Sequence, residues 1–268
     1  MTADERIALI RVKIERAKKH IDDLDISCRY FFSSDPYKVE SKSDPKKGQR
    51  TYHLVSAKDI PPDISPVIGD ILQNLRSALD HMAFQLFKVG PGGQSGGDGK
   101  HIYFPIFDGA AKYKSGVIGK VRGMRQNAID AIQAVKAYKG GNEILWRLHA
   151  LNNLDKHRLL ITAVSSLSAH SILPSVRVKL IEGFKGSRPG DPIPDLGETL
   201  MHVRHVVLKA GDILLTIPES EVEQYMQFRF IITFAEPGII EGEPIIETLQ
   251  HMADLVDNIV SSFGPLLA

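Results

Sequence analysis

The chain has 268 residues, of which 43% are hydrophobic, so it can bury one large core or two smaller ones. Its formal net charge is +1, which excludes the uniformly basic surface of a dedicated duplex-DNA binder and leaves only local basic patches for a nucleic-acid site. Cys28 is the single cysteine, so no disulfide forms within the chain, and this usage is typical of a reducing compartment.

The N-terminus and the hydropathy of the chain predict a cytoplasmic protein. The first ten residues, MTADERIALI, lack the basic segment and the apolar run of a secretory signal. No stretch approaches the roughly 18 consecutive apolar residues that a membrane-spanning helix needs. We therefore expect no membrane span and no membrane partner.

Two long helices are predicted in the first third of the chain, at residues 4–33 and 67–88. In both, apolar side chains recur at steps of three and four, which places them along one face of a helix. Between the helices, two Asp-Pro pairs break the helical pattern, and a β-prone run predicts a short strand or hairpin near residues 50–56. The stripe of the second helix is the more regular: Ile68, Ile71, Leu72, Leu75, Leu79, Met82, Ala83 and Leu86.

A glycine-rich connection, residues 89–100, follows the second helix. It is not a phosphate-binding loop, because Gln94 stands where that motif requires a glycine, and His101 follows Lys100 where it requires Ser or Thr. Residues 101–107 should form a short strand or an extended segment packed on the core. Two more helices are predicted at 117–138 and 142–162.

The pattern changes after residue 170, where β-branched and alternating segments predict strands of an antiparallel sheet built mainly from residues 170–235. A final amphipathic helix is predicted at 243–263. Helices, then strands, then a helix predict an α+β fold: a helical bundle with an antiparallel sheet inserted before the C-terminal helix. We expect a mainly helical part at 1–165, a β region at 170–238, and a C-terminal helix at 243–268 that packs back on the bundle.

Two of the predicted helices carry similar polar groups among their apolar residues, NLRSALDH at 74–81 and NNLDKHR at 152–158. In the first, Asn74 and His81 are seven positions apart and share a direction on a helix. Arg76 and Asp80, four apart, can form an ion pair. Arg76 and His81 are expected to flank one groove, where a phosphate could meet both.

The second polar group combines an acid, a base and two imidazoles on one helix. His149, Asn153, Lys156 and His157 lie along one side, and Asp155 is close enough to orient the His157 ring. On the first predicted helix, His20 lies next to two aspartates. Three helices therefore each offer a histidine with a carboxylate nearby.

Three uses of these groups are open. An imidazole beside a cation can cleave a phosphodiester by acid–base chemistry, because the imidazole moves the proton and the cation stabilises the developing charge. Histidines from separate helices of a bundle can bind a divalent metal, as in a metal-dependent hydrolase. The groups can also form buried hydrogen-bonded networks that fix how the helices pack in a structural or oligomerising protein.

The segment GDILQNLRSALDHMAFQL resembles the HEPN superfamily (higher eukaryotes and prokaryotes nucleotide-binding domains), whose signature is an arginine followed after a few residues by a histidine, here Arg76 and His81. The wider pattern, with LHALNNLDKHRLL, also resembles a group of bacterial proteins of unassigned activity. HEPN domains are helical bundles, often dimeric, and many are metal-independent endoribonucleases of toxin–antitoxin, phage-defence or RNA-processing systems. The chain departs from the family in having Ser77 after the arginine and in its β-rich segment 170–235.

The resemblance implies an RNA-binding or RNA-cleaving protein that needs no cofactor. Arg76 would stabilise the phosphate charge, and His81 would act as general acid or base. The implied partners are RNA or a nucleotide, a second copy of the chain and an antitoxin. The residues expected to support the pair are Asn74, Asp80, Asp155, Lys156, His157 and His20.

Overall fold

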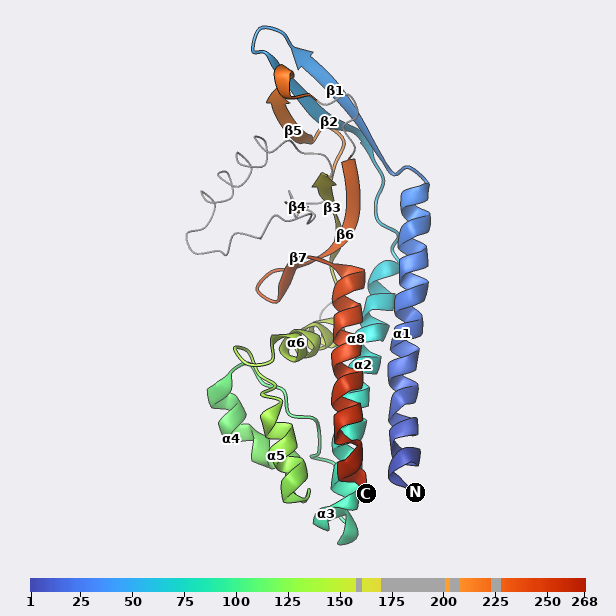
Figure 1. Ribbon diagram of the computed structural model, residues 1–268, viewed down its shortest axis with the longest axis vertical. Helices are drawn as coiled ribbons and strands as arrows, with labels where there is room; N and C mark the ends of the chain where they lie inside the picture. Colours follow the sequence, from blue (N-terminus) through green and yellow to red (C-terminus); the bar gives the residue numbers. More distant parts are fainter. Residues whose placement is uncertain (158–160, 170–200, 203–207, 223–227) are drawn as a thin grey trace.

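The computed structural model describes residues 1–157, 161–169, 201–202, 208–222 and 228–268 (Figure 1). These residues form seven α-helices and two small antiparallel sheets, which confirms the predicted α+β class. No helix in these parts of the chain combines the length and the apolar character needed to cross a membrane.

Three long helices lie side by side and form the bundle: α1 (Ala3–Ser33), α2 (Ile64–Val89) and α8 (Ile245–Phe263) (Figure 1). α1 begins at a capping box, in which Thr2 and Glu5 each bind the other's backbone N–H. The predicted apolar stripes of the first two helices are buried against each other and against α8. Burial of these stripes, more than helix propensity, stabilises the three helices.

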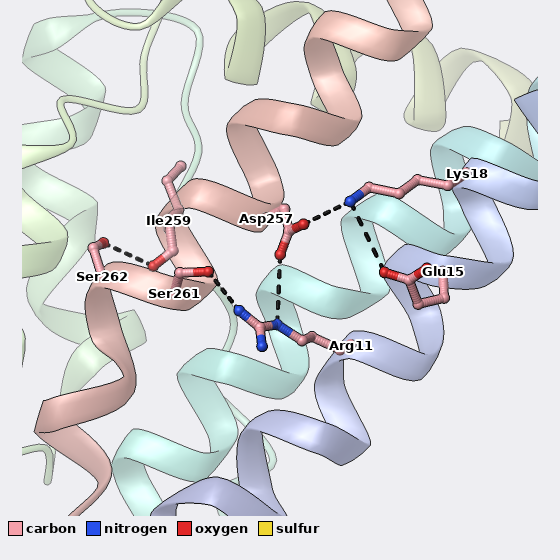
Figure 2. Close-up of polar contacts among 7 residues, drawn as sticks. All are labelled: Arg11, Glu15, Lys18, Asp257, Ile259, Ser261 and Ser262. Carbon is pink, nitrogen blue, oxygen red and sulfur yellow. Dashed lines mark hydrogen bonds and ion pairs between the residues drawn. The ribbon is translucent and has the colours of Figure 1, made fainter.

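Polar contacts between α1 and α8 fix which faces of the two helices are turned toward each other (Figure 2). The Lys18 ammonium lies 2.6 Å from Oδ2 of Asp257. The Arg11 guanidinium donates to the Ser261 hydroxyl at 2.8 Å and lies 3.6 Å from Oδ1 of Asp257. The Asp257 carboxylate of α8 therefore interacts with two cationic side chains of α1, Lys18 and Arg11.

The single helix predicted at 117–138 is two helices, α4 (Ala110–Val121) and α5 (Gln126–Ala134). Gly123 lies between them with φ at +88°, a conformation that breaks a right-handed helix and favours glycine. A Cβ at this position would lie 2.9 Å from the Phe87 ring, so close packing against α2 also requires glycine. The prediction was wrong because the break depends on this distant contact.

The other helical predictions differ from the structure at their ends. The glycine-rich connection contains the single-turn helix α3 (Pro91–Gln94). α6 (Glu143–His157) replaces the helix predicted at 142–162, since residues 161–162 are not helical and a strand begins at Ala163. Residues 101–107 are extended, as expected, and contribute Ile102, Phe104 and Ile106 to the core.

The β structure consists of two sheets rather than one. The first has the order β1-β2-β5, from β1 (Tyr37–Asp44), β2 (Gln49–Ala57) and β5 (Ile213–Pro218). The second has the order β4-β3-β6-β7, from β3 (Ala163–Ala169), β4 (Met201–His202), β6 (Phe228–Glu236) and β7 (Ile240–Pro244). Residues 170–200, 203–207 and 223–227 of the β region predicted at 170–238 lie outside the described residues.

The hairpin predicted near residues 50–56 is longer, and its second strand pairs with β5. The sheet is therefore no simple insertion before the last helix, because residues 49–53 pair with residues 213–218 across the sequence. The two sheets also contact each other, since the Tyr37 hydroxyl donates to the Ser165 hydroxyl and the Tyr37 ring packs against Phe230. Burial raises the pKa of Tyr37.

Candidate functional site

The predicted pair of Arg76 and Asp80 forms, and it lies against the extended segment 101–107. Nη2 of Arg76 lies 2.9 Å from Oδ1 of Asp80 and donates to the carbonyl oxygen of Phe104 at 2.8 Å. The Phe104 N–H donates to the same Asp80 oxygen at 3.0 Å. The two side chains thus bind both backbone groups of one residue and hold the segment on α2.

Arg76 is only 6% exposed, so the structure differs from the expectation that Arg76 and His81 flank one open groove. His81 is exposed and points to a different side of α2, as five positions along a helix require. The guanidinium faces inward because Asp80, one turn later, and the Phe104 carbonyl supply the acceptors that a buried cation needs.

Burial sets the electrostatics of the pair. It lowers the pKa of Arg76 and raises the pKa of Asp80, while each partner opposes the shift of the other. A guanidinium stays protonated over the whole accessible pH range, so the pair is an ion pair at neutral pH. Lys156 and His81 also lower the pKa of Asp80.

α6 adds a second layer of polar groups beside Arg76. The His149 ring lies 3.0 Å, through Nε2, from the Asn153 amide nitrogen. The pKa of His149 falls to about 4, first because the ring is buried and then because Arg76 is close. His149 is therefore neutral at physiological pH.

Four buried polar atoms of α2 and α6 have no hydrogen-bond partner among the described residues; besides Nε of Arg147 they are Nη1 of Arg76, Nδ1 of His149 and Oδ1 of Asn152. Asn152 is only 1% exposed. Together they offer a cationic donor, an imidazole nitrogen and an amide acceptor. Asn152 and His149 were not among the site residues predicted from the sequence. The position of His149, four residues before Asn153, was the signal that could have indicated its hydrogen bond. No local pattern indicates that Asn152 is buried.

The other predicted site residues are dispersed. The Asn74 amide donates to the Asp70 carbonyl of its own helix at 2.8 Å, so it faces its own backbone. Asp155 packs on α2, where its carboxylate lies against Gly69, and burial with the nearby Asp70 raises its pKa. Lys156 is exposed, and the side chain of His157 lies outside the described residues. His20 is half-buried on α1.

Aromatic and charged groups border the site where α6 begins. The Trp146 indole N–H lies 3.5 Å from Oδ1 of Asp108, and the Lys139 ammonium lies 4.4 Å from the centre of the Trp146 ring. Lys112 binds the other oxygen of Asp108 at 3.1 Å and lowers the pKa of that carboxyl. Trp146 is only 6% exposed, so its ring is covered by the fold and by Lys139 rather than open to a ligand.

A groove of about 1250 Å³ lies elsewhere, between the C-terminal half of α1, β1, β6 and the start of α8. Its described lining includes Cys28, Tyr37 and His251 but none of the predicted site residues. Burial raises the pKa of Cys28 to about 11, so its thiol is unreactive at neutral pH. The groove and the polar groups of α2 and α6 are separate features.

Among the described residues, no three His, Cys, Asp or Glu side chains gather as a metal site requires. Comparison of the chain with protein-family models, with curated proteins and with solved structures found no match. The candidate site is therefore described by its own residues: the buried ion pair of Arg76 and Asp80, the buried polar atoms of α2 and α6 that have no described partner, and the exposed His81 and Lys156.

Proposed function

We propose that the face formed by α2 and α6 binds the phosphate backbone of RNA or a nucleotide, in keeping with the HEPN-like pattern of Arg76 and His81. One observation carries the proposal: Asp80 is already paired with Arg76 at 2.9 Å, while His81 of α2 and Lys156 of α6 are exposed and both lower the pKa of its carboxyl. A phosphate bound at this face would meet the exposed Lys156 ammonium and the His81 imidazole.

In this proposal Arg76 is a positioning residue, because its guanidinium is buried and bound to Asp80 and Phe104. Lys156 takes the place that the sequence pattern assigns to the arginine, since Lys156 is exposed and its charge lowers the pKa of Asp80. His81 is the exposed imidazole that meets the ligand.

The same groups suit metal-independent cleavage of RNA. His81 would take the proton from a 2′-hydroxyl, whose oxygen attacks the adjacent phosphorus, and would return that proton to the 5′-oxygen that leaves. Lys156 would stabilise the extra negative charge that develops on the phosphate oxygens. The products are a 2′,3′-cyclic phosphate and a 5′-hydroxyl, so the proton balance closes without a metal.

The test uses the purified protein, labelled single-stranded RNA and a chelator. We expect the wild type to bind RNA with an affinity that falls with salt, and His81→Ala and Lys156→Ala to weaken binding. Loss of one phosphate contact should lower the salt slope by about one. The matched control is Lys88→Ala, which removes an exposed lysine of α2; this variant should bind RNA like the wild type.

Cleavage is scored in the same samples. His81→Ala should abolish the cyclic-phosphate product, while Lys156→Ala should slow its formation. Absence of RNA binding by the wild type, or equal binding by all four proteins, would contradict the proposed function. Binding without cleavage would retain the nucleotide-binding role and remove the catalytic one.

A second, non-catalytic function is favoured by the contacts of Arg76 and Asp80 with Phe104. In this second function the protein is structural or oligomerising, and Arg76 and Asp80 serve only to hold the extended segment 101–107 against α2. It predicts a large loss of stability for variants at Arg76 and no stabilisation of the wild type by RNA. Thermal unfolding with and without RNA distinguishes the two functions.

A further inference from the structure

The face of α1 that is turned away from α2 and α8 carries a regularly spaced row of residues that do not contribute to the core of the bundle. Residues on this face follow one another at alternating steps of three and four, the spacing that keeps side chains on the seam between two paired helices. We call this row the α1 seam: Leu9, Val12, Arg16, Lys19, Asp23, Ile26 and Tyr30. Its two ends are apolar and its centre is charged.

All seven side chains of the α1 seam are exposed. The apolar ones are among the most exposed large apolar residues described: Leu9 is 57% exposed, Val12 63%, Ile26 65% and Tyr30 79%. α1 lies at the outer edge of the bundle in Figure 1, with α2 and α8 on its other side. Single exposed apolar residues are common, but two at each end of a heptad row indicate a contact surface.

Contacts on both flanks fix the rotation of α1 and so keep the seam turned outward. On one flank, Lys18 and Arg11 bind Asp257 of α8, as Figure 2 shows. On the other flank, the Arg6 guanidinium donates to the Gln85 side chain of α2. The helix cannot turn its exposed apolar residues inward without breaking these contacts and unburying its own core stripe.

We propose that the α1 seam binds the α1 seam of a second copy of this chain, with the two helices antiparallel. An alignment that sets Leu9 opposite the partner's Tyr30 also sets Val12 opposite the partner's Ile26. The same alignment sets Arg16 opposite the partner's Asp23. A two-fold axis near Lys19 repeats each of these contacts, as an isologous dimer requires.

Charge decides the direction of the helices. In a parallel pair, each residue of the seam faces its own copy, so Arg16, Lys19 and Asp23 would each meet a like charge. In the antiparallel pair, Arg16 meets the partner's Asp23 twice, and Lys19 is the one charged residue of the seam that still faces its own copy. Lys19, at the centre, lies about 4.5 Å along the axis from the level of the partner's Asp23, so its long side chain can bend toward that carboxylate.

The size of the seam sets the strength of the dimer. From residue 9 to residue 30 the seam is about 32 Å long, since each helical residue rises about 1.5 Å. Four apolar side chains from each copy and two ion pairs form a contact at the small end of stable interfaces, so the dimer should dissociate measurably on dilution. The surface is separate from α6, and the inference does not depend on the proposed RNA binding.

The charged centre provides the first test, by sedimentation velocity at several protein concentrations. Arg16→Asp and Asp23→Arg each place like charges opposite each other and should weaken the dimer at least about tenfold, or about 1.4 kcal/mol. The double variant exchanges the two charges and should restore dimerisation. Circular dichroism checks that each protein is folded, as expected for exposed positions.

The apolar ends provide the second test. Val12→Asp should yield a monomer, whereas Ile118→Asp, at a similarly exposed position on α4, should leave the dimer intact. For the orientation, proteins carrying V12C and I26C are mixed and oxidised; the antiparallel pair predicts a disulfide between the two variants and little within either alone. The native Cys28 is buried and serves as the unreactive background.

A wild type that is monomeric at every concentration would overturn the proposal. So would a dimer that Val12→Asp leaves unchanged, or a double charge variant that stays as weak as the single ones. Disulfides that form mainly within V12C alone would overturn the antiparallel arrangement. RNA binding by the α2 and α6 face is measured separately, so either proposal can fail without the other.

Discussion

Arg76 and Asp80, one turn apart on α2, form a buried ion pair whose two members both bind the backbone of Phe104. The arginine binds the Phe104 carbonyl and the aspartate binds the Phe104 N–H. This pair connects α2 to the extended segment 101–107 and forms the buried part of the candidate site. The predictions below test its energetics and those of its neighbours.

The interaction between Arg76 and Asp80 should contribute strongly to the free energy of unfolding. Arg76→Met leaves the Asp80 carboxylate without its cation and the Phe104 carbonyl without a donor, so we expect the free energy of unfolding to fall by about 2–4 kcal/mol. Asp80→Asn keeps an acceptor for the Phe104 N–H and should cost less. The double variant should lose clearly less than the sum of the single variants in urea unfolding. Additive losses would mean that the two side chains act independently.

His149 should make the protein less stable as the pH falls. Its pKa is about 4 in the folded chain against an ordinary value of 6.5, so between these values the unfolded state binds a proton that the folded state excludes. Stability therefore rises with pH across this window, and about 1–3 kcal/mol present near pH 7 should be lost toward pH 4.

The measurement is chemical unfolding of the wild type and of His149→Gln from pH 7 to pH 4. Asp80 and Asp155, whose pKa values are raised, bind protons more readily when folded and act in the opposite direction in both proteins. The difference between the two curves isolates the imidazole. Parallel curves would contradict a buried neutral His149.

Gly69 should be required by its close approach to Asp155. A Cβ on Gly69 would lie 2.6 Å from Oδ1 and 2.8 Å from Cγ of that carboxylate, so Gly69→Ala must displace α6 or the aspartate. We expect a loss of about 1 kcal/mol or more despite the better helix propensity of alanine. With Asp155→Ala in place, the same substitution should become neutral or stabilising by up to about 1 kcal/mol. An unchanged effect in the two backgrounds would show that the carboxylate is not the obstacle.

The ion pair of Lys18 and Asp257 should stabilise the contact of α1 with α8 only modestly. Both side chains are partly exposed, so we expect a coupling of about 0.5–1 kcal/mol in a double-mutant cycle of Lys18→Met and Asp257→Asn. The Asp257 hydrogen bond raises the pKa of Lys18, so this stability is complete at neutral pH and is lost only above the ordinary lysine pKa. Lys13→Met on the same helix is the control, and the coupling should shrink in high salt.

The helices of the bundle were predictable because their signal is local. The apolar steps in residues 4–33 and 67–88 correspond to α1 and α2 within a few residues at each end, since one buried face imposes the helical period directly. The break at Gly123 was not predictable, because it depends on the Phe87 ring more than thirty positions away. Neither was the start of β3 soon after α6.

The candidate site was predictable only in its components. Spacing alone predicts that Arg76 and Asp80 can pair, and the structure confirms the contact at 2.9 Å. Spacing does not reveal that the guanidinium faces Phe104, because a segment 28 positions later provides the acceptor. For the same reason the sequence does not reveal that polar atoms of Asn152 and His149 are buried, because their burial depends on the packing of α6 on α2.

By itself the sequence determines the α+β class and the main helices, since each follows from residue types at short, regular intervals. Only the tertiary structure decides that β5 joins the N-terminal hairpin, that Arg76 is buried while His81 is exposed, and that the seam of α1 is left outward. The physical reason is that burial and strand pairing depend on neighbours that the chain brings together across long separations, and no local pattern specifies which neighbour a side chain will meet.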